Sequence, residues 1–259
     1  CIVVSPLIAL MKDQVDRLKS KKIRAAAIYS GMNFNEINIM LDNCIYGNYK
    51  FLYISPERID TDLFKIKAQH FKVNLIAVDE AHCISQWGYD FRPSYLEITK
   101  LREMFPAAPV LAVTATATPS VVNDIMSKLN FRNNVIIKSG FERENLTYLV
   151  RNKNDKIGYL LSVIGKVKGS GIIYVRNRKK TKEIATELRK RGLNADFYHA
   201  GLDFKERESK QNDWMKSTNG IIVCTNAFGM GIDKSDVTYV VHLDLPDSPE
   251  AYFQEAGRA

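Results

Sequence analysis

Leu75-Ile76-Ala77-Val78-Asp79-Glu80-Ala81-His82 is a short apolar run that ends in two adjacent acids. Four apolar residues that include β-branched side chains predict a buried strand of a parallel sheet. Ligands of open α/β sheets bind at the carboxyl ends of such strands, where Asp79 and Glu80 are expected. Two carboxylates there suit a magnesium nucleotide, because one can hold the hydrated metal while the other orients a water that attacks phosphate. Two acids capping a strand in solvent are the simpler alternative.

An aromatic-rich segment, Trp87-Gly88-Tyr89-Asp90-Phe91-Arg92, follows the acids within a few residues. Hydrophobic packing explains aromatic side chains at such a place only in part. Two aromatic rings and an arginine beside a candidate nucleotide site therefore need a further explanation. The segment therefore favours the interpretation of the acid pair as a nucleotide site.

Composition and charge indicate a globular protein with a polyanionic partner. The chain has 259 residues, of which 46% are hydrophobic and 25% charged, enough for one large or two ordinary domains. Its formal net charge is +8 and its pI about 9.2. Lysine and arginine contacts with phosphates release counterions, so the charge indicates nucleic acid, although it can also serve solubility alone.

The cysteines and the apolar runs set further expectations. Cys1, Cys44, Cys83 and Cys224 are scattered singly, so we expect reduced thiols and no zinc site. No apolar run is long enough to span a bilayer and no signal peptide is present, so we expect no membrane partner. The expected location is cytoplasmic, at the nucleoid in a bacterium, or nuclear in a eukaryote. The chain starts in a strand pattern and stops in a helix pattern, so we expect a fragment.

Apolar strands alternate with amphipathic helices along the chain, which predicts parallel sheets with right-handed crossovers. We expect an α/β protein of two tandem lobes, residues 1–140 and 141–259, with a polar linker at 139–145. The predicted strands are 1–4, 50–54, 74–78 and 110–113, then 171–175, 195–198, 220–224 and 237–242. The predicted helices are near 7–18, at 33–43 with Asn33 and Glu36 at its start, and at 95–104, 119–129, 156–167, 179–191 and 204–215.

Further candidate residues follow other predicted strands. Thr114-Ala115-Thr116-Ala117-Thr118 closes the strand 110–113 at the sheet edge of Asp79, where hydroxyls and small residues permit close approach to phosphate or to the acid pair. Thr118 before Pro119 is equally a helix start. In the second lobe, Phe228-Gly229-Met230-Gly231-Ile232-Asp233 offers glycines for close backbone approach and an acid for a ribose hydroxyl. Arg258, on or beside a short helix, could stabilise a transferring phosphoryl group, although most arginines simply face solvent.

The order of these motifs resembles that of superfamily-two helicases, and specifically of the RecQ family of DNA helicases. The resemblance covers essentially the whole chain. Its most specific part is the aromatic-rich loop, residues 86–93, which separates this family from other DEAH-box enzymes. The matching stretches are 4–15, 55–58, 79–88, 90–93, 111–117, 198–202, 228–233 and 254–259.

The resemblance implies two RecA-like lobes, ATP and Mg²⁺ as cofactors, and single-stranded and partially duplex DNA as the partner. It implies that Asp79 holds Mg²⁺ through water, that Glu80 orients the hydrolytic water, and that His82 bonds to the strand end at 114–116 and relays the nucleotide state. The residues then expected to face the nucleotide are Thr114, Thr116, Gly231, Asp233, Gln254 and Arg258. The residues expected to contact DNA are Trp87, Phe91 and Arg92 in the aromatic-rich loop and, along the DNA backbone, Ser5, Ser55, Arg58, His199 and Thr225.

The chain departs from the family pattern at several places. Tyr89 stands where family members often carry histidine, although a tyrosine can still stack and donate a hydrogen bond. No phosphate-binding loop Gly-x-x-x-x-Gly-Lys-Ser/Thr occurs: Gly165-Lys166 is followed by Val167 and has Leu160 where the first glycine belongs. The second arginine of the family's last motif would follow Ala259.

Three hypotheses follow from these observations. The first is an ATP-driven DNA helicase core, whose parent protein unwinds with 3′-to-5′ polarity in repair and recombination, and which is inactive as an ATPase when cut as here. The second is a nucleic-acid-binding module without turnover, because little remains to hold the β- and γ-phosphates. The third is an RNA-remodelling DEAH-box enzyme, which the aromatic-rich loop disfavours.

Overall fold

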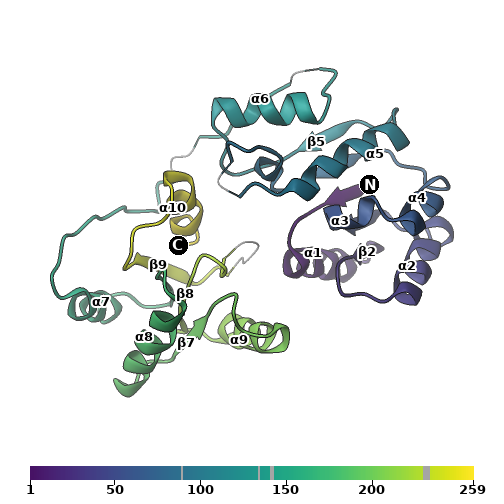
Figure 1. Ribbon diagram of the computed structural model, residues 1–259. Coiled ribbons are helices and arrows are strands. Elements are labelled where there is room, and N and C mark those ends of the chain that lie inside the picture. Colours follow the sequence, from purple (N-terminus) through teal and green to yellow (C-terminus); the bar gives the residue numbers. More distant parts are fainter. Residues whose placement is uncertain (89, 134, 141–142, 230–233) are drawn as a thin grey trace. The chain divides into compact units, whose positions relative to one another are not determined.

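The computed structural model describes residues 1–88, 90–133, 135–140, 143–229 and 234–259 (Figure 1). Contacts divide the chain into two compact units, Cys1–Ile137 and Lys138–Ala259, called lobe 1 and lobe 2 below. Each lobe is built on a parallel sheet with helices, which confirms the predicted α/β fold class. The functional boundary after residue 140 and the linker at 139–145 stay predictions, and residues 141 and 142 lie outside the described residues.

Lobe 1 contains a five-stranded parallel sheet of order β2-β3-β1-β4-β5. The strands are β1 (Ile2–Val4), β2 (Ala25–Ile28), β3 (Phe51–Ile54), β4 (Ile76–Val78) and β5 (Val110–Ala112). Successive residues of β1 serve opposite faces: Val3 packs with Met11 and Val15, whereas Ile2 and Val4 belong to the larger core cluster. Because both faces are covered, the strands are apolar runs without polar alternation.

The helices of lobe 1 begin where the sequence offers local caps. They are α1 (Ile8–Ser20), α2 (Phe34–Tyr46), α3 (Pro56–Ile59), α4 (Asp62–Ala68), α5 (Ile98–Met104) and α6 (Pro119–Lys128), with the 3₁₀ turns η1 (Ala81–Ile84) and η2 (Pro93–Glu97). Asn33 and Glu36 form the predicted capping box at the start of α2. Thr118 accepts a hydrogen bond from the Val121 amide and precedes Pro119, so the predicted helix start is confirmed.

Lobe 2 contains a four-stranded parallel sheet of order β7-β8-β6-β9. Its strands are β6 (Ser170–Tyr174), β7 (Ala195–Tyr198), β8 (Ile221–Cys224) and β9 (Val237–His242). Its helices are α7 (Lys156–Ile164), α8 (Arg178–Lys190), α9 (Phe204–Lys216) and α10 (Pro249–Ala256). Among the helices of both lobes, within the residues described, none is long and apolar enough to cross a membrane.

Four elements escape the sequence-based prediction: β2, α3, α4 and the 3₁₀ turn η1. β2 is an alanine-rich strand, Ala25–Ile28, whose composition does not favour extended structure. Its residues pair with β3, and all but Ala27 are buried. The short helices α3 and α4 fill the interval after β3, for which no helix is predicted from the sequence. The remaining predicted elements are present, with ends that shift by a few residues.

Candidate nucleotide and nucleic-acid sites

The carboxyl edge of the lobe 1 sheet gathers the residues predicted from the first lobe. Val4 lies opposite Ile54 and Val78 in register, and Val78 lies opposite Ala112. The residues that follow these strands therefore emerge at one level, and they include Ser5, Ser55, Asp79 and the segment that leads to Thr114. Backbone bonds continue across the edge, with the Asp79 amide donating to Val4 at 2.9 Å. The structure thus brings Asp79 and the threonine-rich segment to the same sheet edge.

Asp79 is held by its neighbours rather than pointing freely into solvent. Its Oδ1 accepts the Glu80 amide at 3.0 Å, and its Oδ2 accepts the hydroxyl of Ser5 at 3.3 Å. Ser5 is fully buried, and burial raises the pKa of Asp79 above its ordinary value while both hydrogen bonds oppose that shift. Each carboxylate oxygen retains a lone pair for a further ligand.

Glu80 adopts a left-handed backbone, with φ 47° and ψ 46°. A residue with a Cβ pays about 1 kcal/mol for this conformation, so surrounding contacts must impose it. The Ala81 amide donates to the Val113 carbonyl at 3.0 Å, and the Glu80 carboxylate lies 3.4 Å from His82 Nδ1. The turn after β4 is therefore fixed at both ends, with the strained residue between them.

His82 joins the turn after β4 to the strand end after β5. Its Nδ1 lies 2.9 Å from the Thr114 hydroxyl, and the Thr114 hydroxyl donates to the Thr116 carbonyl at 3.4 Å. The Thr114 oxygen is then available to accept a proton from Nδ1–H. The imidazole is completely buried, and burial lowers the pKa of His82 to about 4. His82 is therefore neutral at physiological pH and acts as a fixed hydrogen-bonding bridge.

The aromatic-rich loop combines exposed and anchored side chains. Trp87 is 76% exposed, as a stacking platform requires. Arg92, in contrast, donates to Asp90 Oδ2 from Nε at 3.0 Å and from Nη2 at 2.8 Å, and to the Pro6 carbonyl from Nη1 at 3.2 Å. The structure therefore places Arg92 in an ion pair with its own loop, in which two guanidinium nitrogens donate to one oxygen of Asp90. Tyr89, where the sequence departs from the family, lies outside the described residues.

Two hydroxyls at this edge are buried without a hydrogen-bond partner among the described residues: Ser55 Oγ and Thr116 Oγ1. Arg58, predicted with Ser55 as a DNA contact, donates from Nη2 to the Tyr29 carbonyl at 3.3 Å. Buried hydroxyls normally find a partner, so such atoms at a sheet edge are candidates for ligand contacts.

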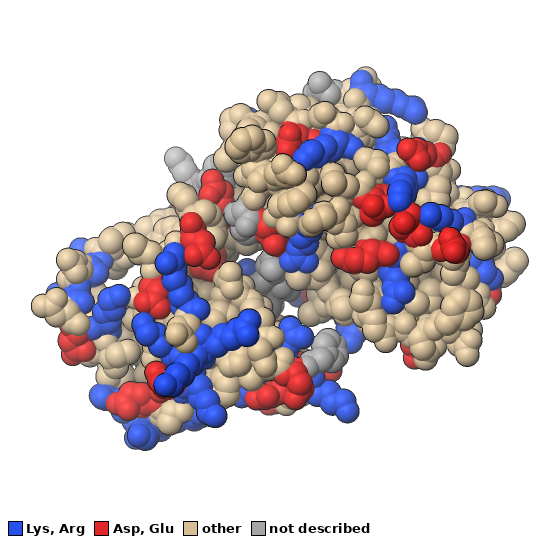
Figure 2. Space-filling model, in the orientation of Figure 1, with Lys and Arg blue, Asp and Glu red and all other residues tan. Residues whose placement is uncertain are grey.

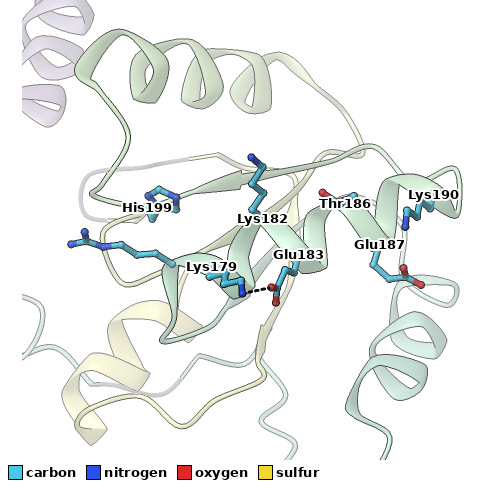
Figure 3. Close-up of a pocket in the computed structure, with 8 residues that line it drawn as sticks. Lys179, Lys182, Glu183, Thr186, Glu187, Lys190 and His199 are labelled. Carbon is cyan, nitrogen blue, oxygen red and sulfur yellow. Dashed lines mark ion pairs between the residues drawn. The ribbon is translucent and has the colours of Figure 1, made fainter.

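In lobe 2, His199 and Thr225 follow adjacent strands at one level, because Tyr198 of β7 lies opposite Cys224 of β8. Thr225 Oγ1 accepts the Ala227 amide at 3.4 Å. His199 lines a groove of about 540 Å³ with one face of α8. Figure 3 shows Lys182 and Lys179 on the half of α8 that lies near His199, and Lys190 further along the helix.

The groove belongs to a basic helix. Of the thirteen residues of α8, six are Lys or Arg and two are Glu. Figure 2 shows Lys and Arg side chains gathered over this part of lobe 2. The two glutamates of α8 offset its positive charge only in part. The ion pair between Lys179 and Glu183 is long, at 3.7 Å, and exposed, and is therefore weak.

The end of the chain packs around α10. Gln254 lies in this helix and Arg258 just after it. A Cβ on Gly229, whose φ is 142°, would lie 2.8 Å from Arg258 Cζ and 2.7 Å from the Tyr174 hydroxyl, so only glycine fits there. His242 at the end of β9 lies 2.8 Å from Glu255 through Nε2 and Oε2, with both side chains about nine-tenths buried. Gly231 and Asp233 lie outside the described residues.

Sequence reasoning missed several residues that complete these sites. Tyr95 is fully buried, and its hydroxyl donates to the Asp79 carbonyl at 2.8 Å. No pattern in the sequence indicates the pair of His242 and Glu255, because β9 and α10 come together only in the folded lobe. Asp124 and Lys128 stand four residues apart on α6, and that spacing is the only pattern from which their ion pair could have been predicted.

Sequence comparison assigns a class to this fold and these sites. The sequence model of the DEAD/DEAH box helicase family matches residues 1–125, and that of the helicase conserved C-terminal domain matches residues 152–259. The chain is thus a two-lobed helicase core. ATP-dependent DNA helicase RecQ of Pasteurella multocida is 44% identical over 259 residues, which is all of this chain and 41% of that protein. The chain belongs to the RecQ family.

Solved structures share the fold at lower sequence identity. The Mycobacterium smegmatis helicase Lhr, bound to ssDNA and AMP-PNP, matches all of the chain over 38% of its own length, with a TM-score of 0.74 and 17% identity. Dbp5 of S. cerevisiae, bound to RNA and ADP BeF3, matches 99% of the chain over 67% of its own, with a TM-score of 0.75 and 19% identity. At this identity the likeness establishes the two-lobed α/β fold and nothing finer.

Proposed function

We propose that this chain is the core of an ATP-driven DNA helicase that moves along a single strand with 3′-to-5′ polarity, in repair and recombination. The observation that carries the proposal is the set of contacts at Asp79. Its carboxylate lies at the candidate nucleotide edge, and its carbonyl accepts the hydroxyl of Tyr95, which follows the aromatic-rich loop. The residue at the end of β4 thus offers a carboxylate to the candidate nucleotide site and is hydrogen-bonded to the residue that follows the candidate nucleic-acid loop.

The acid pair supports phosphoryl transfer to water. Mg²⁺ would be held by Asp79 through water, and when bound it neutralises charge on the phosphates. Asp79 fits such a site, because its carboxylate offers hard oxygen ligands and each oxygen accepts only one hydrogen bond from the described residues. Glu80, whose carboxylate lies 3.4 Å from His82 Nδ1, would orient the attacking water. Gln254 and Arg258 of lobe 2 are assigned to the nucleotide by resemblance.

Exposed aromatic and basic groups support nucleic-acid binding. Trp87 can stack on any base, so this contact is independent of sequence. The lysines of α8 near His199 suit a phosphate backbone, where contacts position a strand without specifying its bases. The name of the Pasteurella relative favours DNA over RNA as the strand. Single-stranded and partially duplex DNA are therefore the proposed partners.

The alternative without turnover has one specific observation in its favour. The printed sequence contains no phosphate-binding loop, so a polypeptide of these 259 residues lacks the lysine and amides that hold β- and γ-phosphates. We expect this polypeptide alone to bind single-stranded DNA weakly and to hydrolyse ATP negligibly. DNA-stimulated hydrolysis by the isolated polypeptide would contradict that expectation.

The test of the proposed function is ATP hydrolysis by the full-length gene product, with and without single-stranded DNA. We expect stimulation by DNA, and a fall of about 10²-fold or more in Glu80→Gln with ATP binding retained, because a positioned water-orienting group contributes that much. Glu103→Gln, an exposed change on α5, is the control. Full turnover in Glu80→Gln would overturn the assignment. DNA binding without hydrolysis in the wild type would favour the binding module, and preferential stimulation by RNA the third hypothesis.

A further inference from the structure

The base of the aromatic-rich loop is fixed by two residues of α6. Ser85, fully buried directly before the loop, donates its hydroxyl proton to Asp124 Oδ2 at 2.7 Å and accepts the Trp87 amide proton at 3.1 Å. Lys128 donates to Asp124 at 3.2 Å and to the Ile84 carbonyl at 3.0 Å. On one side of Ser85, the Ile84 carbonyl is therefore bonded directly to Lys128. On the other side, the Trp87 amide is linked to Asp124 through the Ser85 hydroxyl.

The ion pair on α6 belongs to a hydrogen-bond network that includes the loop base. The side chains of Asp124 and Lys128 are 28% and 29% exposed, and both also hydrogen-bond to the loop base. The hydrogen bond that Ser85 donates is the main influence on Asp124 and lowers the pKa of its carboxyl group, so the carboxylate stays ionised at neutral pH. The Lys128 ammonium also lies 6.0 Å from the centre of the Phe91 ring, inside the loop.

The same helix starts at the strand end that carries the candidate nucleotide contacts. Thr118 caps α6, and the segment immediately before it contains Thr114, which is bonded to His82. A helix is a rigid element, so a displacement of its first turn moves Asp124 and Lys128 with it. α6 therefore links the bridge between His82 and Thr114 to the base of the aromatic-rich loop.

We propose that Asp124 and Lys128 are positioning residues that couple the aromatic-rich loop to the nucleotide edge of lobe 1 through α6. They act through Ser85 and the loop backbone, and neither is assigned a contact with nucleotide or strand. The inference rests on the proposed function, because it explains how strand binding at the loop could raise the rate of hydrolysis.

The test measures ATP hydrolysis by the full-length protein as a function of single-stranded DNA concentration. Ser85→Ala and Asp124→Leu are expected to lower the DNA-stimulated kcat by about two- to thirtyfold, as a coupling of this kind predicts, with the KM for ATP unchanged. Asp124→Asn keeps an acceptor for Ser85 and should recover most of the stimulation. Asp42→Leu is the matched control, because Asp42 forms a similarly half-buried pair with Lys67 in lobe 1.

Hydrogen exchange followed by mass spectrometry provides a second readout that does not depend on activity. Amide exchange in a peptide covering residues 84–88 should accelerate in Asp124→Leu and Ser85→Ala and stay unchanged in Asp42→Leu. Normal DNA stimulation and normal amide exchange in both Ser85→Ala and Asp124→Leu would overturn the inference while leaving the helicase assignment intact. A wild-type protein without DNA-stimulated hydrolysis would instead overturn the proposed function.

Discussion

The Tyr95 hydroxyl donates a hydrogen bond to the backbone carbonyl of Asp79 at 2.8 Å. Tyr95 lies in η2, directly after the aromatic-rich loop, and is completely buried. Its hydroxyl is therefore an internal strut between the segment that carries Trp87 and Arg92 and the strand end that carries the acids.

Tyr95→Phe removes the strut and leaves the Asp79 carbonyl without this donor. We expect a loss of about 1–2 kcal/mol in the free energy of unfolding, and a lower kcat for DNA-stimulated hydrolysis because the acid pair is less firmly held. Urea unfolding and steady-state kinetics measure the two effects. Ile98→Val, a core change of about 1 kcal/mol on α5, is the control for stability alone. Equal kinetics in the two variants would show that the strut has no functional part.

The buried imidazole of His82 makes stability depend on pH. Its folded pKa is about 4, below the ordinary value of 6.5, so the unfolded chain takes up a proton first as the pH falls. The ionisation of His82 therefore leaves the free energy of unfolding unchanged above pH 6.5. As the pH falls from 6.5 to about 4, it lowers the free energy of unfolding progressively. The full loss is about 3 kcal/mol, from the 1.36 kcal/mol that each pKa unit represents.

His82→Asn isolates this effect, because an amide in place of Nδ1–H can still donate to Thr114 and does not titrate. Between pH 7 and pH 5, the urea midpoint of unfolding should fall less in the variant than in the wild type. Asp79, whose pKa burial raises, shifts stability in the opposite direction, but it is common to both proteins. Equal pH dependence in the two would show that His82 titrates normally.

Trp87 is expected to contribute to DNA binding and not to stability. Because its side chain is 76% exposed, Trp87→Ala should change the free energy of unfolding by less than about 0.5 kcal/mol. Loss of one stacked base should weaken single-stranded DNA binding by about five- to 150-fold, corresponding to 1–3 kcal/mol. Fluorescence anisotropy with labelled oligonucleotides measures the change. Phe34→Ala removes another exposed aromatic of lobe 1 and should leave the affinity unaltered.

The pair of His242 and Glu255 should stabilise lobe 2 cooperatively. Its partners are about nine-tenths buried, so removal of either alone leaves a polar group without its bond. A double-mutant cycle with His242→Leu and Glu255→Leu should give a coupling of about 1–3 kcal/mol by urea unfolding. The exposed pair Lys179 and Glu183 on α8 should give about 0.5 kcal/mol or less. Similar couplings for both pairs would contradict the role of burial.

Much of the fold could be predicted because its signals are local. Apolar runs gave the strands, and the caps at Asn33 and Thr118 gave two helix starts. β2 could not be predicted in this way, because Ala25–Ile28 is extended through pairing with β3 and burial, which local propensity does not contain.

The candidate site was predictable to the level of the sheet edge and no further. Parallel strands end at one level, so the neighbourhood of Asp79 and Thr114 followed from the sequence. Side-chain direction did not: Ser5 bonds to Asp79, and Arg92 pairs with Asp90 inside its own loop. Their predicted contacts with DNA, like those of the other site residues, stay predictions.

The left-handed backbone of Glu80 has a consequence for laboratory evolution. A glycine there would relieve the conformational strain of about 1 kcal/mol, and with it would go the carboxylate assigned to the hydrolytic water. Selection for thermostability without selection for turnover is therefore expected to enrich Glu80→Gly. Under the proposed function, the most heat-resistant descendants would bind ATP without hydrolysing it.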